Sequence, residues 1–177
     1  MERNLHIGGK HRVQGWEILD ANAGPAVDHV RNATDLGCFA DGTFAQIYAS
    51  HVIEHFDYKE VLLATLSEWH RVLAPGGRLY ASVPDLDVLA RLFIDRRNLD
   101  VDARYLVMRM MFGGHIDQYD YHLVGLNDEF LAGYLQAAGF VDIQRVERFG
   151  IFDDTSNLAL NGTLISLNLI ARKAERT

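Results

Sequence analysis

Glycines and a carboxylate occupy the positions where two short apolar segments end. Gly8 and Gly9 follow Leu5-His6-Ile7, and Asp20 follows Glu17-Ile18-Leu19. Glycine lacks a Cβ, so a ligand can approach its backbone amide closely, and an acidic side chain at a strand end can accept hydrogen bonds from a ribose diol. Adjacent glycines and a single aspartate also occur in ordinary turns. Their shared position favours a nucleotide-like ligand.

Further polar residues follow the same pattern along the chain. The Asp35 carboxylate can accept a hydrogen bond from an adenine amino group while the adjacent Leu36 covers the ring, and Ser50 and His51 come where another apolar run ends. Lys10 can meet a carboxylate. Ligands of open α/β sheets bind beyond the carboxyl ends of the strands, so we expect these residues to gather at that edge.

The segment His51-Val52-Ile53-Glu54-His55 matches the HxxEH pattern of inverted zinc proteases. Two histidines four residues apart on a helix can share a zinc ion, with Glu54 as the general base. However, the motif falls at a predicted strand-to-helix junction, and a protease site needs a third ligand from a distant helix. We therefore predict no metal site and keep a zinc hydrolase as a remote alternative.

A second polar cluster follows Gly113-Gly114 and contains two histidines, His115 and His122, among aspartates and tyrosines. One interpretation is a solvated loop with turn-forming glycines. The other is a substrate-facing lid, since residues that bind or react are often carried on loops. Both interpretations stay open from the sequence.

Strand-like and helix-like patterns alternate along the chain. Asp57 and Glu60 resemble a capping box, Pro75-Gly76-Gly77 ends the helix that follows, and Asn127 and Gly139 bound a late helix. This alternation predicts an α/β fold with a mostly parallel sheet, closed by an antiparallel C-terminal hairpin. The expected strands are 5–7, 17–19, 44–50, 78–83, 140–148 and 163–171, and the expected helices are 57–73, 86–96, 104–112 and 127–138.

Composition narrows the class of protein. The 177 residues carry 17 basic and 24 acidic side chains, a net charge of -7, which argues against nucleic acid as a partner. There is no polybasic run, long apolar run or signal-peptide pattern, so we expect no membrane association. Cys38 is the single cysteine, which suits a reducing compartment. We expect one cytoplasmic domain over residues 1–177 with a small-molecule partner.

The ordered motifs LHIGG, GWEILD, TDL, FAQIYASHVIEHF and RVLAPGGRLYASVPDL resemble the class I S-adenosylmethionine-dependent methyltransferases. The chain looks most like a small bacterial variety, sometimes found with cell-surface saccharide genes. The resemblance implies a Rossmann-like fold with S-adenosylmethionine as cofactor. It would place Gly8 and Gly9 near the methionine part, Asp20 at the ribose, Asp35 and Leu36 at the adenine, and Ser50 and His51 at the sulfonium.

The chain departs from that family in its first motif. Only two glycines are present, Lys10 follows them, and Asp20 comes eleven positions after Gly9. Dinucleotide-binding folds place the corresponding acid about twenty residues after the glycines, with a helix between. We therefore expect the first helix to be shortened or missing.

The resulting hypothesis is an enzyme that transfers the methyl group of S-adenosylmethionine in line to a small-molecule acceptor, with a saccharide as one candidate. A histidine could remove the acceptor's proton, for which His51 is the first candidate and His122 and His115 the next. The alternative is a catalytically degenerate binding or regulatory module of the same fold.

Overall fold

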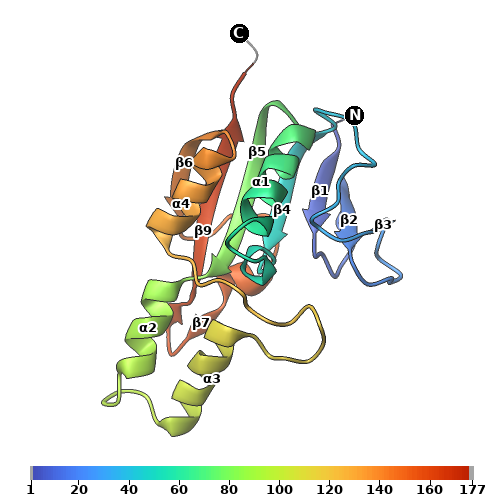
Figure 1. Ribbon diagram of the computed structural model, residues 1–177. Coiled ribbons are helices and arrows are strands. Elements are labelled where there is room, and N and C mark those ends of the chain that lie inside the picture. The colour runs from blue at the N-terminus through green and yellow to red at the C-terminus, as the bar shows by residue number, and fades with distance from the viewer. Residues whose placement is uncertain (1, 176–177) are drawn as a thin grey trace.

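A computed structural model of the chain describes residues 2–175. Seven strands form one sheet in the order β3-β2-β1-β4-β5-β9-β6 (Figure 1). Neighbours from β3 to β5 are parallel, and β9 is antiparallel to both β5 and β6. The strands are β1 (Asn4–Ile7), β2 (Trp16–Asp20), β3 (His29–Val30), β4 (Phe44–Ser50), β5 (Leu73–Pro84), β6 (Phe140–Val146) and β9 (Ser166–Lys173).

This topology confirms the predicted α/β fold with an antiparallel C-terminal pair. The strand last in sequence, β9, is inserted between β5 and β6, so β6 forms the edge of the sheet. A separate two-stranded hairpin, β7 (Ala159–Leu160) with β8 (Thr163–Leu164), was not predicted because each strand has only two residues.

Two helices, α1 (Val61–Val72) and α4 (Asp128–Ala137), cover one face of the sheet. The predicted apolar stripe of α1 is confirmed, since Leu62, Leu66 and Trp69 are fully buried in the main core. Asn127 caps α4 as predicted, because its side chain accepts a hydrogen bond from the Phe130 amide.

Several predicted boundaries were wrong. Helix α1 begins at Val61 rather than at Asp57, whose carboxylate instead accepts from the Lys59 amide in a turn, and Glu60 makes no side-chain cap. Strand β5 already begins at Leu73 and includes the Pro-Gly-Gly segment. Helix α3 (Val101–Phe112) begins three residues before the predicted start, because Asp100 caps it.

Helix α3 packs against α2 (Leu86–Ile94) beyond the end of the sheet (Figure 1).

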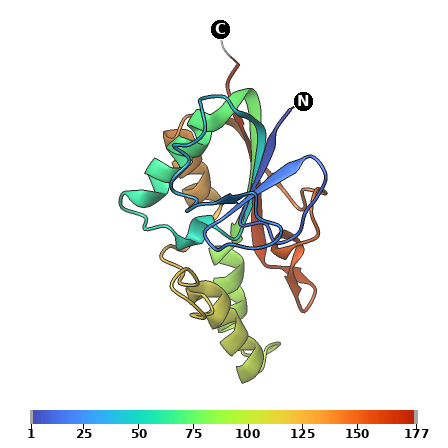
Figure 2. The same cartoon turned by 90° about the vertical axis from the view of Figure 1, so that its right-hand side faces the viewer.

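The opposite face of the sheet is covered differently. Residues 8–15 between β1 and β2 form turns and irregular backbone, which confirms the prediction that the first helix is shortened or missing. The segment 147–158 crosses this face instead, seen on the right of Figure 2. Its Phe152 ring lies 4.2 Å from the His6 ring and 4.6 Å from the Tyr48 ring, measured between centroids. An aromatic layer thus replaces the packing of a helix.

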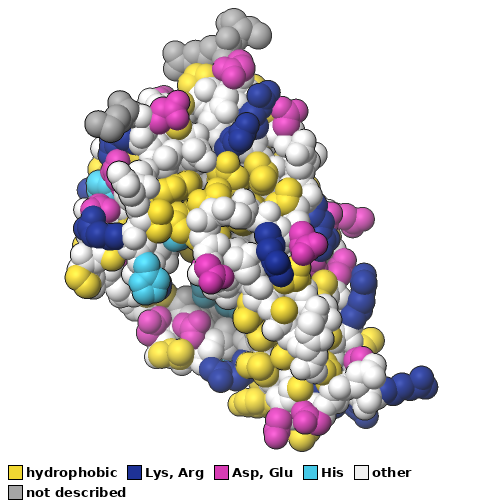
Figure 3. All heavy atoms as spheres, turned by 180° about the vertical axis from the view of Figure 1, so that it is seen from behind, with side chains coloured by type: hydrophobic (Ala, Val, Ile, Leu, Met, Phe, Trp, Pro, Cys, Tyr) yellow, Lys and Arg dark blue, Asp and Glu magenta, His cyan; other side chains and the backbone are white. Residues whose placement is uncertain are grey.

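Figure 3 shows the molecule from behind, relative to Figure 1. Hydrophobic side chains gather across the middle of this face, and histidines lie below them. Within residues 2–175, every helix is too short or too polar to cross a bilayer.

Candidate functional site

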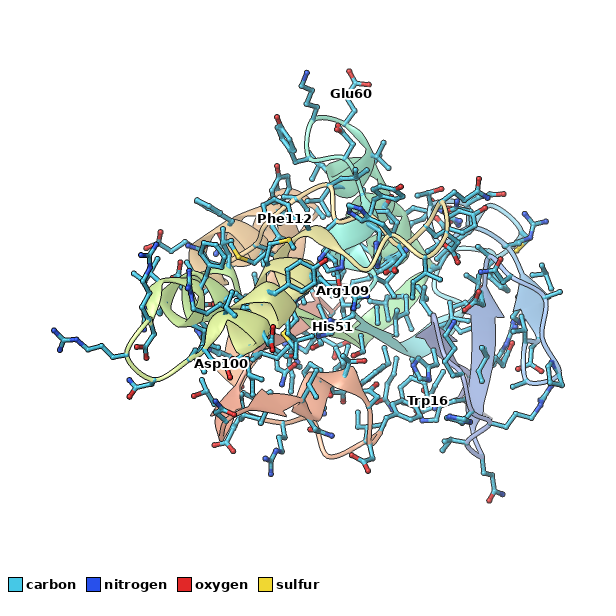
Figure 4. The ribbon with its side chains drawn as sticks, turned by 90° about the horizontal axis from the view of Figure 1, so that it is seen from below. Trp16, His51, Glu60, Asp100, Arg109 and Phe112 are labelled. Carbon is cyan, nitrogen blue, oxygen red and sulfur yellow. The ribbon has the colours of Figure 1, made fainter. Side chains whose placement is uncertain are left out.

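A cavity of about 810 Å³ opens at the carboxyl ends of β1, β2 and β4. This volume lies within the range of small-molecule sites. Gly8, Asp20, Ser50 and His51 all line it, so the structure brings together four of the predicted residues from three strands. In Figure 4, which looks at this end of the molecule, His51 lies between α3 and the strands β1 and β2.

Asp20 lies on the cavity wall and is only 9% exposed. Its Oδ1 accepts a hydrogen bond from the Asn22 amide at 2.8 Å, and its Oδ2 accepts one from Lys10 Nζ at 3.0 Å. The Lys10 side chain is 72% exposed, so it can leave the carboxylate without breaking the core. Asp20 therefore presents an oriented acceptor at the position where β2 ends.

Gly8 makes a turn that a larger residue would disturb. Its φ is +76°, its amide donates to the Leu19 carbonyl at 2.8 Å, and a Cβ would lie 2.9 Å from Val52 Cγ2. Gly9 is buried and lies beneath the turn rather than among the lining residues, and a Cβ there would lie 2.8 Å from His6 Cγ. The two glycines thus share a turn, but only Gly8 borders the cavity.

Gly8→Ala should lower the free energy of unfolding by about 2 kcal/mol, because it combines a left-handed backbone with a steric clash. Gly15→Ala is the matched control in the same loop, since its φ is +86° but nothing lies within 4 Å of a Cβ. Urea denaturation should show the larger loss for Gly8→Ala. Equal losses would mean that Val52 moves aside freely.

The positions of Asp35 and Leu36 do not favour the prediction that they contact an adenine. Leu36 is fully buried in the main core, so its side chain cannot cover a ligand ring. Asp35 is exposed and pairs with Arg31 at 2.8 Å. The residues that line the cavity after β3 are Asn32 and Ala33. The sequence did not indicate these two residues, because β3 has only two residues and no apolar run to mark its end.

His51 lines the cavity, but its ring is held by protein groups. The Ser166 hydroxyl donates to the Thr155 carbonyl at 2.9 Å, so its oxygen accepts from His51 Nε2, also at 2.9 Å. The other nitrogen, Nδ1, then carries the lone pair and lies 3.4 Å from Glu54 Oε1. Burial, with a contribution from His122, lowers the pKa of His51 to about 4. His51 is therefore neutral at neutral pH.

The other two predicted catalytic histidines lie outside the set of described residues that line the cavity. His122 is partly buried, which lowers its pKa to about 4, and its Nε2 lies 3.9 Å from Glu54 Oε1. His115 is exposed, stacks on Tyr121 with centroids 4.1 Å apart, and bonds to the Phe112 carbonyl. Only His51 of the three therefore reaches the cavity.

The loop that carries these histidines does border the cavity, through Ile116, Asp117, Tyr119 and Asp120. This position agrees with the substrate-facing interpretation of the loop. Sequence reasoning missed the opposite wall, formed by residues 151–155. There Asp154 accepts hydrogen bonds from the Tyr48 hydroxyl at 2.9 and 3.1 Å. Since 106 positions separate these two residues, no local pattern could have joined them.

Comparisons with known proteins point to one fold. A family model described as "Methyltransferase domain" matches residues 16–81, which include β2, β4, the HVIEH segment and α1. The chain is also similar to a solved S-adenosylmethionine-dependent methyltransferase from Archaeoglobus fulgidus, at 18% identity and a TM-score of 0.60, over 97% of this chain and 86% of that one. This chain has a class I methyltransferase fold.

Two other structures of this fold are similar. The 1,6-didemethyltoxoflavin-N1-methyltransferase of Burkholderia thailandensis, solved with S-adenosylhomocysteine, is 17% identical with a TM-score of 0.57, over 98% of this chain and 72% of that one. A possible exported protein of Bordetella parapertussis is 12% identical with a TM-score of 0.60. Here the match covers 98% of this chain but 63% of the Bordetella protein, less than two thirds of its length. The comparison with curated proteins found no match. These comparisons confirm the resemblance to class I methyltransferases in its fold.

Proposed function

We propose that the chain is an S-adenosylmethionine-dependent methyltransferase that acts on a small-molecule acceptor. The observation that carries this proposal is the cavity at the strand ends, where the Gly8 turn and the Asp20 carboxylate share one wall. The match to the methyltransferase domain family and the structural similarity to an enzyme solved with S-adenosylhomocysteine support the same cofactor.

The residues of this chain fit such a cofactor. Gly8 leaves its backbone open to close approach, Asp20 offers two carboxylate oxygens to a ribose diol, and Asn32 supplies a polar side chain after β3. The sulfonium supplies an already activated methyl group, so the protein has mainly to orient the acceptor in line and exclude water.

The acceptor side of the cavity is polar. Asp117, Tyr119 and Asp120 border it from one loop, and Asp153 and Asp154 from the other. Carboxylates and hydroxyls bind the hydroxyl groups of an acceptor, so we propose a polyhydroxyl compound such as a saccharide, methylated on oxygen. The carboxylates are also placed to take up the proton that the acceptor hydroxyl loses.

A binding module without turnover is the second candidate. The specific observation in its favour is that both ring nitrogens of His51 face protein groups, Ser166 and Glu54, rather than the cavity. Release of S-adenosylhomocysteine in the presence of a panel of sugars distinguishes the two: cofactor binding without any release would favour the module.

Asp20→Asn should weaken the binding of S-adenosylhomocysteine by about tenfold or more, equivalent to about 1.4 kcal/mol, because a neutral amide accepts the diol less strongly. Isothermal titration calorimetry of the purified chain measures this change. Asp35→Asn is the matched control: Asp35 is exposed and lies outside the cavity lining, so its substitution should leave the affinity within about twofold. If the unaltered protein showed no binding at millimolar cofactor, the proposal would fail.

A further inference from the structure

A buried carboxyl group lies behind His51 without an evident structural role. Glu54 is 1% exposed, and neither of its carboxylate oxygens has a hydrogen-bond partner among residues 2–175. A buried carboxyl group usually has hydrogen-bond partners, because losing water without replacement costs several kcal/mol. This unpartnered Glu54 side chain therefore points to a missing ligand.

Two imidazoles stand beside Glu54. One candidate ligand atom from each of Glu54, His55 and His122 lies within 4.8 Å of the other two. The rings of His55 and His122 are 4.9 Å apart between centroids, at an angle of 73°. The Glu54 carbonyl accepts from the Leu123 amide at 2.8 Å, so backbone pairing fixes the loop that carries His122 next to the short helix η1 (Ile53–His55).

The hydrogen bonds of His55 leave one nitrogen available. Its Nδ1 bonds to the Tyr121 carbonyl at 3.1 Å, and because a carbonyl only accepts, Nδ1 must carry the proton. The lone pair of His55 is then on Nε2. Histidines that bind metals commonly donate their second nitrogen to a backbone carbonyl or a carboxylate in this way.

We propose that Glu54, His55 and His122 bind one divalent transition-metal ion of the zinc class. Two imidazoles and one carboxylate form a ligand set that catalytic zinc sites use, with the fourth position left for an oxygen ligand. Tetrahedral zinc with bonds of about 2.0–2.1 Å needs ligand atoms about 3.3 Å apart, so the three side chains must close in by about an ångström.

This site differs from the HxxEH pair that the sequence suggested. The ligand atoms that gather within 4.8 Å come from Glu54, His55 and His122, so His122, from a separate loop, stands where the sequence pattern suggested His51. His55 also lines the cavity, so an ion held there can meet an oxygen atom of a molecule bound in the cavity. The metal site itself does not depend on the proposed methyl transfer.

Zinc and cobalt titrations of the full chain test the proposal. After treatment with a chelator, calorimetry with Zn²⁺ should show one ion per chain, and Co²⁺ should give visible absorption bands of a low-symmetry site. Glu54→Gln and His122→Asn should each weaken Zn²⁺ binding at least about a hundredfold, since each removes a direct ligand. His115→Asn should bind as the unaltered chain does, because His115 is exposed on the same loop outside the cluster.

Circular dichroism and thermal melting in the presence of chelator establish that each variant folds. If Glu54→Gln does not fold, His122→Asn decides the question alone, since the His122 side chain is less buried than that of Glu54. Zinc should also raise the melting temperature of the unaltered chain, because binding to the native state stabilises it by mass action. The proposal is overturned if the unaltered chain binds no stoichiometric ion, or if the ligand variants bind as tightly as the His115→Asn control.

Discussion

Trp69→Ala should lower the free energy of unfolding by about 3–5 kcal/mol, the largest loss that we expect from a single substitution in this chain. Trp69 is fully buried between α1 and the sheet, and its Nε1 donates to the Ala33 carbonyl at 2.8 Å. The variant leaves both a large void and an unpaired buried carbonyl. Because Ala33 lines the cavity, cofactor binding should weaken as well.

Urea denaturation followed by circular dichroism measures the loss. Leu63→Ala is the control on the same helix, where the side chain is 36% exposed, and it should cost less than about 1 kcal/mol. Trp69→Phe should fall between the two, since it keeps much of the volume but removes the Nε1 hydrogen bond. A loss for Trp69→Ala as small as that for Leu63→Ala would show that this part of the core can rearrange.

The second large effect is an acid-induced loss of stability that depends on His6. Burial lowers the pKa of His6 to about 4 from 6.5, and the charge of Asp154 opposes this shift only in part. Because the folded pKa lies below the unfolded one, the unfolded chain binds the proton first as the pH falls. The contribution of His6 is therefore present above pH 6.5 and is lost between pH 6.5 and 4, by at most about 3 kcal/mol.

Unfolding free energies across this pH range test the prediction. His6→Phe keeps an aromatic ring against Phe152 and cannot titrate, so its stability should fall less steeply with acid than that of the unaltered chain. His51 and His122 titrate in the same direction and leave a residual slope in the variant. The assignment to His6 would be refuted by parallel curves for His6→Phe and the unaltered chain.

The parts of the fold that the sequence predicted well are those with dense local signals. Strand β4 has the predicted bounds, and Asn127 caps α4 as expected, because an apolar run and a capping side chain each act within a few residues. The absence of the first helix was also predicted from the sequence, since the eleven positions from Gly9 to Asp20 leave little room for a helix beside β2.

The parts that the sequence could not predict depend on contacts between residues that lie far apart in the sequence. Strand β3 is held by two register pairs with β2 rather than by its own composition, so the strand was not predicted, and Asn32, which lies just after it, was missed. Asp154 reaches Tyr48 across 106 positions. Similarly, His122 is brought close to Glu54 because the neighbouring Leu123 amide donates to the Glu54 carbonyl. No spacing in the sequence indicates this contact.

The insertion of β9 between β5 and β6 has a consequence for biosynthesis. A nascent chain on the ribosome can build β1 to β5 early, yet its sheet then ends in an open β5 edge until residues 166–173 emerge. Open edges invite pairing with other chains, and late long-range closure slows folding. The wall at 151–155 must also wait for that closure, so the newborn polypeptide acquires its ligand site only after residues 166–173 have emerged.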